Sequence, residues 1–227
     1  LTKEWLSLSE TKINLKQIIF FVAPVALSFY FLEKFIALYL FTATFLWFGY
    51  SALLISKKSS LINSISFKNN YLGIFLMLSF LFSLIYLMLF LEFPGMNKFF
   101  VLFLVLFNTA LVDVAAYLVG SSIGKTPLFP EISPNKTLEG FLGGLFAVLI
   151  FMISMYSIDL ISLELLVISM LSIPFTFSGD YFESQLKREQ NIKDSGSLIP
   201  GHGGIWDRLD SHIAVVPIFV SFSILAI

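Results

Sequence analysis

Long, uninterrupted apolar stretches dominate this chain and restrict the folds open to it. A helix that crosses the hydrocarbon core of a bilayer needs about 20 mostly apolar residues. Such stretches lie at about 17–32, 35–55, 71–92, 99–120, 138–157, 161–179 and 211–227. Because backbone polar groups in lipid must find partners within their own segment, each stretch favours a helix. We therefore predict an all-α, polytopic integral membrane protein with about seven transmembrane helices in a single domain, residues 1–227.

The rest of the composition excludes several functional classes. A net charge of -1 provides no basic field that would attract nucleic acid. The absence of Cys excludes disulfides, thiol catalysis and Cys-ligated zinc, and two histidines are too few for a histidine-rich metal site. Residues 1–16 are too polar for a signal peptide, and the chain begins with Leu1 rather than Met. We therefore expect the natural N-terminus to lie further upstream.

Positive charge is distributed unevenly between the two sides of the predicted membrane. When the spans alternate in direction, 12 of the 14 Lys and Arg residues fall on one side, and Lys34 and Lys98 fall on the other. Short cytoplasmic loops retain positive charge. We therefore predict that the N-terminal segment and the loops at about 56–70, 121–137 and 180–210 are cytoplasmic, and that the turns at 93–98 and 158–160 face outward.

Charged residues are concentrated between 180 and 210, beginning with "SGDYFESQLKR". This stretch follows an apolar span and is predicted to continue as a helix, with Asp180, Glu183, Ser184, Lys187 and Arg188 on one face. A carboxylate near the bilayer with two cations a turn or two further out could hold a metal ion and the phosphates that it bridges. A solvated polar stripe with ordinary ion pairs fits the same spacing equally well.

The next stretch, "SGSLIPGHGG", is a glycine-rich loop that ends at Gly203 and Gly204. Glycines allow backbone N–H groups to converge on an anion, and His202 adds a donor, although such a loop is more often a simple turn. The sequence "DRLDS" follows after Ile205 and Trp206 and places Asp207 and Asp210 on one face where the last span begins. Carboxylates at the mouth of a transmembrane helix are costly and indicate function.

A second polar group lies upstream, inside the span "NTALVDVAAYLVG". Asp113 and Tyr117 are one helical turn apart and share a face with Ala116 and Gly120. An acidic residue within a membrane span faces a polar cavity or a partner. The alternative interpretation is a hydrogen-bonded anchor between helices.

The loop after this span contains two lysines, Lys125 and Lys136, and the pair Ser133 and Pro134. The pair resembles the N-cap and first residue of a helix, and a helix start beside two lysines is suited to phosphate. Ordinary capping together with cytoplasmic lysines explains the pattern equally well. All these polar groups fall on the predicted cytoplasmic side, which favours one shared site.

Two long motifs resemble the signature of one enzyme family. Residues 184–211, "SQLKREQNIKDSGSLIPGHGGIWDRLDS", contain Ser, Lys-Arg, Lys-Asp, Pro-x-His-Gly-Gly and Asp-Arg-x-Asp at the spacing found in phosphatidate cytidylyltransferases, also called CDP-diacylglycerol synthases. Upstream, "DVAAYLVGSSIGKTPLFPEISPNKTLEG" resembles another segment of that family. The resemblance makes roughly 108–211 the motif-bearing catalytic core. Family members usually carry further hydrophobic spans before the stretch that Glu4 and Trp5 resemble, which implies that N-terminal spans are missing here.

The resemblance implies a reaction in which CMP passes from CTP to phosphatidic acid, giving CDP-diacylglycerol and pyrophosphate. A lipid phosphate oxygen attacks the α-phosphorus of CTP, so catalysis consists mainly of positioning and charge neutralisation. The resemblance further implies an integral protein of the bacterial cytoplasmic membrane that works as a homodimer. Its active site would face the cytoplasm.

The resemblance also assigns roles to individual residues. Asp180 and Asp207 would hold Mg²⁺, with room for a second cation such as K⁺. The phosphates would be held by Lys187, Arg188, Lys193, Arg208, Lys125 and Lys136, with further substrate contacts from Ser184, His202, Gly203, Gly204, Ser133, Asp113 and Tyr117. Asp210 would orient these cations or a metal-bound water.

Two other functions remain open on the residues alone. CTP-dependent polyprenol or phytol kinases share the membrane setting and the nucleotide, although less of the His-Gly-Gly and Asp-Arg-x-Asp pattern is expected in them. A transporter could use Asp113, Asp180 and Asp207 as an ion pathway. Transporters often contain inverted repeats, and the sequence shows no internal repeat.

Overall fold

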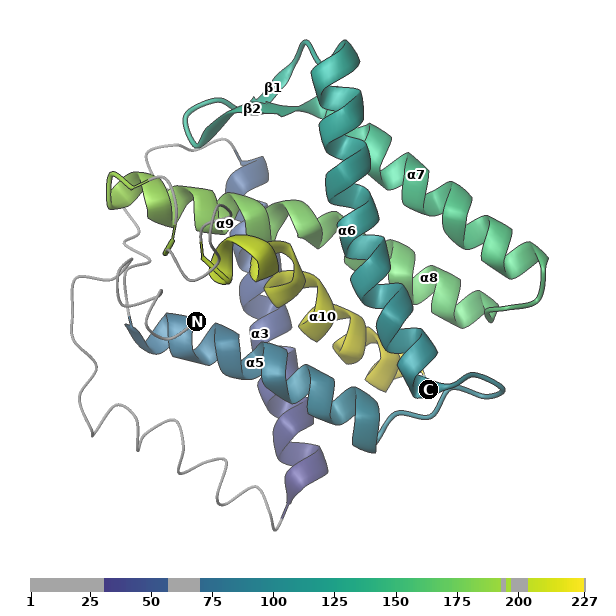
Figure 1. Ribbon diagram of the computed structural model, residues 1–227. Helices are drawn as coiled ribbons and strands as arrows, with labels where there is room; N and C mark the ends of the chain where they lie inside the picture. Colours follow the sequence, from purple (N-terminus) through teal and green to yellow (C-terminus); the bar gives the residue numbers. More distant parts are fainter. Residues whose placement is uncertain (1–30, 57–69, 193–194, 197–203, 227) are drawn as a thin grey trace.

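Long helices carry most of the described chain, as the apolar stretches predict. The computed structural model describes residues 31–56, 70–192, 195–196 and 204–226. In chain order the elements are α3 (Leu32–Ile55), α5 (Asn70–Leu89), α6 (Lys98–Ile123), β1 (Pro127–Phe129), β2 (Ser133–Thr137), α7 (Leu138–Ser157), α8 (Leu163–Ser172), the 3-10 turn η1 (Ile173–Phe175), α9 (Thr176–Glu189) and α10 (Trp206–Ala226). Figure 1 shows the two strands at one end of the helices, away from the α5–α6 and α7–α8 connections.

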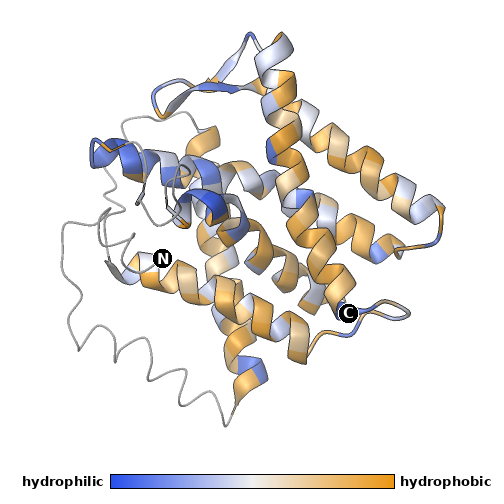
Figure 2. Ribbon diagram, viewed as in Figure 1, coloured by the Kyte–Doolittle hydropathy of each residue, from blue (hydrophilic) through white to orange (hydrophobic). Residues whose placement is uncertain are grey.

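Six of the described helical segments are long and apolar enough to cross a membrane. α8, η1 and α9 together form one of them, Leu163–Glu189. These six correspond to six of the predicted spans. The predicted span at about 17–32 falls almost entirely on residues 1–30, which lie outside the described residues. The all-α polytopic membrane fold is therefore confirmed. Figure 2 shows hydrophilic residues gathered at the strands, along α9 and at the start of α10, while hydrophobic residues cover the helix flanks.

Helix α10 forms the centre of the bundle. Every residue from Ile213 to Val220 is buried, and α10 packs against α3, α5, α6, α8 and α9. A helix that is apolar on all sides is stable only when it is surrounded. The outer helices instead expose large apolar side chains such as Phe45, Phe99 and Phe146. Lipid chains are as apolar as these side chains, so the exposed rings are suited to contact with the bilayer.

Helices α6 and α7 approach each other closely along a line of small residues. A Cβ added to Gly140 would lie 2.7 Å from the carbonyl oxygen of Ala116. One added to Gly144 would lie 2.8 Å from the carbonyl oxygen of Val112. Glycines four residues apart therefore form the α6–α7 seam, a packing arrangement common between membrane helices.

The seam predicts a stability change that depends on position. Gly144→Ala is expected to destabilise the protein by about 1 to 3 kcal/mol because the new methyl group must push two backbones apart. Gly49→Ala is the matched control, since nothing lies within 4 Å of a Cβ at this helical position. It is expected to be neutral or slightly stabilising, because alanine favours helix. Thermal melting in detergent measures both, and equal melting temperatures for the two variants would contradict the seam.

The loop between α6 and α7 contains a β-hairpin, which corrects one prediction. Ser133 begins strand β2 and pairs with Phe129 of β1 in an antiparallel ladder. Ser133 and Pro134 therefore do not cap a helix. Helix α7 begins later, at Leu138, and its N-cap is Thr137, whose hydroxyl accepts a hydrogen bond from the backbone N–H of Gly140 at 3.1 Å. The local capping pattern is outweighed by strand pairing with residues earlier in the loop.

Candidate active site

The site is built where α9 crosses the start of α10, and Gly179 makes this crossing possible. A Cβ at Gly179 would overlap the backbone carbonyl oxygen of Asp210 and lie 3.0 Å from the Cα of Ser211. Only a residue without a side chain allows the two backbones to approach this closely. The crossing brings Asp180, the next residue of α9, beside Asp210 of α10.

Three carboxylates meet at this crossing. Asp180 and Glu183 of α9 and Asp210 of α10 each offer an oxygen, and these oxygens all lie within 4.8 Å of one another. Glu183 is only 1% exposed, and its Oε1 has no hydrogen-bond partner among the described residues. A buried carboxylate oxygen without a partner is costly, so its presence in a cluster of carboxylates indicates a place for a cation.

Lys187 connects this cluster to Asp207. Its Nζ lies 2.6 Å from Glu183 Oε2 and 2.9 Å from Asp207 Oδ1. The second oxygen of Asp207 accepts hydrogen bonds from the backbone N–H and hydroxyl of Ser195, at 3.0 and 2.9 Å, and from the backbone N–H of Gly204 at 2.8 Å. Asp207 therefore fastens both described ends of the glycine-rich loop to the first turn of α10.

Lys136 of β2 supplies the second cation at the carboxylates. Its ammonium group forms an ion pair with Asp180 and lies 4.6 Å from the centre of the Tyr181 ring. The ring is fully buried and also packs edge-on against Phe129 of β1, with centroids 5.0 Å apart. Tyr181 thus holds both strands of the hairpin against α9.

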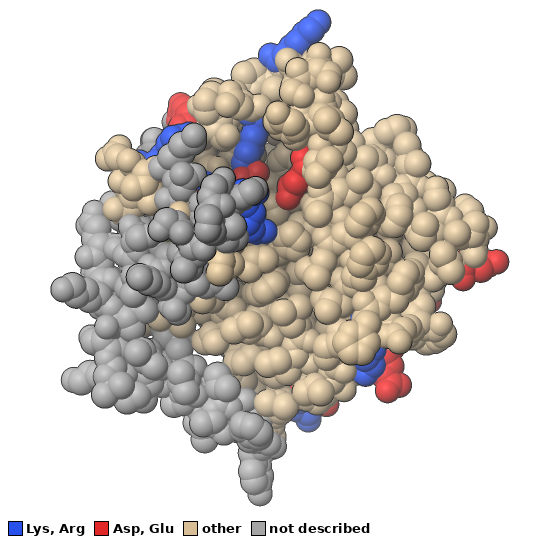
Figure 3. All heavy atoms as spheres, in the orientation of Figure 1, with Lys and Arg blue, Asp and Glu red and all other residues tan. Residues whose placement is uncertain are grey.

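A cavity of about 780 Å³ opens in front of Asp180, and we call it the polar cavity. It is lined by parts of α6, the hairpin, α7 and α9, and it includes the sequence-predicted residues Asp113, Tyr117, Lys125, Ser133, Lys136 and Asp180. Ala116 and Gly120, predicted to share a face with Asp113, also line it. Figure 3 shows acidic and basic side chains gathered in a hollow on this side of the molecule. The structure therefore brings these sequence-predicted residues together around one cavity.

The charges around the carboxylates suit a divalent cation. Four carboxylates, those of Asp180, Glu183, Asp207 and Asp210, face the two ammonium groups of Lys136 and Lys187. The carboxylates outnumber the ammonium groups, and all the available ligand atoms are oxygens. A cluster of oxygen ligands fits a hard divalent cation. Asp180 belongs both to the sequence-predicted metal pair with Asp207 and to the cluster with Glu183 and Asp210.

The other predicted residues lie around this centre or outside the described residues. Arg188 and Arg208 are exposed, and Ser184 is half-buried on α9. Lys193, His202 and Gly203 lie outside the described residues.

Sequence reasoning missed two features of the site, Glu183 as a member of the carboxylate cluster and Gly179. The spacing had placed Glu183 on the same face as Asp180, which was a usable signal. No local pattern distinguishes Gly179, because its role depends on a contact with α10.

The ion pair between Lys187 and the buried Glu183 predicts that removing the lysine charge destabilises the protein. Lys187→Met is expected to lower stability by about 1.5 to 3 kcal/mol, because it removes a charge-assisted hydrogen bond and leaves a buried carboxylate unpaired. Thermal melting in detergent measures this loss, and the exposed neighbouring change Arg188→Met is the control. The double variant Glu183→Gln, Lys187→Met is expected to recover part of the loss. A single Lys187→Met variant that melts like the wild type would show that the pair is not formed.

Comparisons with known proteins agree on one family. A profile described as the cytidylyltransferase family matches residues 1–225. Phosphatidate cytidylyltransferase of Bacillus subtilis (strain 168) is 47% identical over 109 residues, which are 46% of this chain and 40% of that protein. The protein of the same name from Staphylococcus aureus (strain COL) is 44% identical over 113 residues, 48% of this chain and 43% of the relative. The matched segment therefore spans less than half the length of either relative.

Proposed function

Because this chain belongs to the cytidylyltransferase family, we propose that it is a phosphatidate cytidylyltransferase, which transfers CMP from CTP to phosphatidic acid and releases pyrophosphate. Relatives from two bacterial genera carry this name. The observation that carries the proposal is the polar cavity, in which lysines and carboxylates meet at one end of a membrane-spanning bundle. A lipid phosphate from the bilayer and a nucleotide from water can both reach such a place.

The residues of the cavity suit this reaction. A phosphate oxygen of phosphatidic acid forms a bond to the α-phosphorus of CTP, and the bond from that phosphorus to the pyrophosphate oxygen breaks. No protein nucleophile is needed, so the protein contributes position and charge. Lys125 and Lys136 line the polar cavity and would hold phosphate oxygens. Lys187, which lies between Glu183 and Asp207, would do the same together with Arg188 and Arg208.

Mg²⁺ is part of the proposal. The sequence-predicted ligands are Asp180 and Asp207, and the described geometry adds Glu183 and Asp210 around Asp180. When bound, the ion would neutralise negative charge on the triphosphate and on the departing pyrophosphate. A second cation such as K⁺ fits the excess of carboxylates. Release of Lys136 from Asp180 would free its ammonium group for a phosphate.

We further propose that the site faces the cytoplasm of a bacterial cell and that the protein works as a homodimer. Single Cys residues in this Cys-free chain test the orientation. Cys at Asn97 and at Asp159, in the α5–α6 and α7–α8 connections, is expected to react with an impermeant reagent added outside. Cys at Lys125, beside the hairpin, is expected to react after the membrane is opened. Labelling of Asn97→Cys and Lys125→Cys from the same side would overturn the orientation.

The proposed activity is tested by release of pyrophosphate from CTP in detergent or lipid. Release is expected to depend on phosphatidic acid and on a divalent cation. A kinase would instead leave CDP and a phosphorylated alcohol, and a transporter would release neither product. Pyrophosphate release that continues without phosphatidic acid, or no turnover by well-folded full-length protein, would overturn the proposal.

A further inference from the structure

A second cavity lies next to the polar cavity and shares two lining residues with it. It has a volume of about 260 Å³ and lies between α3, β1, α7 and the segment from η1 to α9. We call it the apolar cavity, and its lining residues are Ser51, Leu54, Ile55, Leu128, Phe129, Phe141, Pro174, Phe175, Phe177, Ser178 and Tyr181. None of these side chains is charged, in contrast to the lysines and aspartates of the polar cavity.

One aromatic pair forms the wall between the two cavities. Phe141 of α7 and Phe177 of α9 line both of them. Their rings pack edge to face, with centroids 4.4 Å apart and an interplanar angle of 87°. A charged compartment and an uncharged compartment are therefore separated by the thickness of an aromatic pair.

We propose that the apolar cavity binds part of an acyl chain of the phospholipid whose phosphate lies in the polar cavity. This inference rests on the proposed function and adds a subsite for the lipid substrate. A phospholipid has a charged phosphate and apolar chains only a few bonds apart, which matches the adjacency of the two cavities. Burial of acyl methylenes against Leu54, Leu128 and the two phenylalanines supplies the binding energy.

Tyr181 gives this assignment a second, independent support. Its side chain is fully buried and lines the apolar cavity, while Lys136 of the polar cavity lies over its ring. Its hydroxyl has no hydrogen-bond partner in the part of the chain that the structure describes. A buried hydroxyl normally finds a partner. In the lipid, the ester that joins glycerol to an acyl chain lies between the phosphate and the hydrocarbon. Its carbonyl oxygen can accept a hydrogen bond from the Tyr181 hydroxyl.

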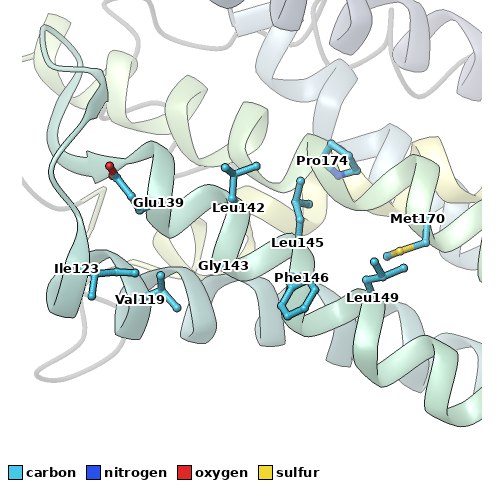
Figure 4. A pocket seen from close by; sticks show the side chains of 10 residues that line it. All are labelled: Val119, Ile123, Glu139, Leu142, Gly143, Leu145, Phe146, Leu149, Met170 and Pro174. Atoms are coloured by element: carbon cyan, nitrogen blue, oxygen red, sulfur yellow. The ribbon is translucent and has the colours of Figure 1, made fainter.

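Another apolar groove is present, but its charge does not suit an acidic lipid. Figure 4 shows this groove, of about 610 Å³, between α6, α7 and α8, with Leu142, Phe146 and Met170 along it. Its charged lining residue is Glu139, whose carboxylate accepts hydrogen bonds from the backbone N–H groups of Lys125 and Thr126. The α6–α7 seam separates it from the polar cavity, and the carboxylate would repel a phosphate. The groove therefore serves as an internal control.

Matched tryptophan substitutions test the subsite. Ile55 and Leu142 are both exposed aliphatic residues, one lining the apolar cavity and the other lining the groove. Ile55→Trp is expected to raise the KM for dioleoyl phosphatidic acid about tenfold, since acyl methylenes lose their place. The KM for CTP and turnover of dihexanoyl phosphatidic acid should stay within about twofold of wild type, because the short chains bury fewer methylenes. Leu142→Trp should leave all three values unchanged, and equal effects of the two variants would overturn the proposal.

Two further measurements test the acyl-chain subsite independently of the tryptophan variants. Tyr181→Phe removes only the hydroxyl and is expected to raise the KM for phosphatidic acid about fivefold, without changing that for CTP. Phosphatidic acid with a photoreactive diazirine in its acyl chain is expected to label α3 and β1 of the wild-type protein rather than α7 and α8 near Met170. Labelling confined to the groove, or spread evenly over the lipid-facing surface, would overturn the subsite. Wild-type protein that is labelled in the apolar cavity but releases no pyrophosphate would instead contradict the proposed function.

Discussion

Replacement of Asp180 by asparagine is expected to lower the rate of CTP turnover by at least about 100-fold. Asp180 belongs to both possible sets of metal ligands, the pair with Asp207 and the cluster with Glu183 and Asp210. It is also the ion-pair partner of Lys136. Asparagine keeps the shape of the side chain but removes its charge, so both the cation and Lys136 lose a partner. Phosphatidic acid-dependent release of pyrophosphate measures the effect, with thermal melting in detergent as the check on folding.

Companion variants identify the other ligand. If Asp207 is the second ligand, Asp207→Asn should lose as much activity as Asp180→Asn and recover part of it at high Mg²⁺. If Asp210 fills this role, Asp210→Asn should show that behaviour instead. Glu131→Gln, an exposed change on the hairpin turn, is the control and should be neutral. Folded Asp180→Asn protein with near wild-type activity at low Mg²⁺ would show that the metal is not at this crossing.

Gly179→Ala is expected to have a comparably large effect although it changes no charge. The added methyl group would overlap the backbone carbonyl of Asp210, and neither backbone can move aside without separating α9 from α10. Overpacking of this kind costs about 1 to 3 kcal/mol of stability. A shift of about 1 Å between Asp180 and Asp210 can cost a further 100-fold in rate.

The change Thr176→Val, at the start of α9, separates this effect from general damage to the helix. It removes the 2.6 Å hydrogen bond that the Thr176 hydroxyl donates to the carbonyl oxygen of Ile173 and should cost about 1 kcal/mol, with little change in turnover. Melting and pyrophosphate release of both variants would be compared. Gly179→Ala protein that keeps both wild-type stability and wild-type rate would contradict the close crossing.

The membrane-spanning helices could be predicted from the sequence because bilayer thickness sets a length that can be read directly from the chain. Helical spacing likewise placed Asp113 and Tyr117 on one face, and both line the polar cavity. The shared location of Lys136 and Asp180 was predicted from the separate polar stretches and the distribution of positive charge. Each of these inferences depends on helical periodicity or on the length and charge rules that the membrane imposes. Both can be read from single segments of the sequence.

The features that escaped prediction depend on contacts between segments. Ser133 and Pro134 resemble a helix start, yet pairing with β1 makes Ser133 the first residue of a strand. Glu183 belongs to the carboxylate cluster only because the crossing of α9 and α10 brings it beside Asp210. Gly179 determines this crossing through a neighbour that is 31 positions away in the chain. Tertiary packing of this kind leaves no pattern in a single segment.

The central position of α10 has a consequence for how the protein is made. Chains are synthesised from the N-terminus at about 5–20 residues per second, so α3, α5, α6, α8 and α9 leave the ribosome before the helix around which they pack. Asp207 and Asp210 arrive on that same late helix. Insertion of α10 therefore fills the core and completes the carboxylate cluster in one step. A nascent chain that has not reached this step has neither a packed interior nor an assembled site, which couples the onset of function to the insertion of α10.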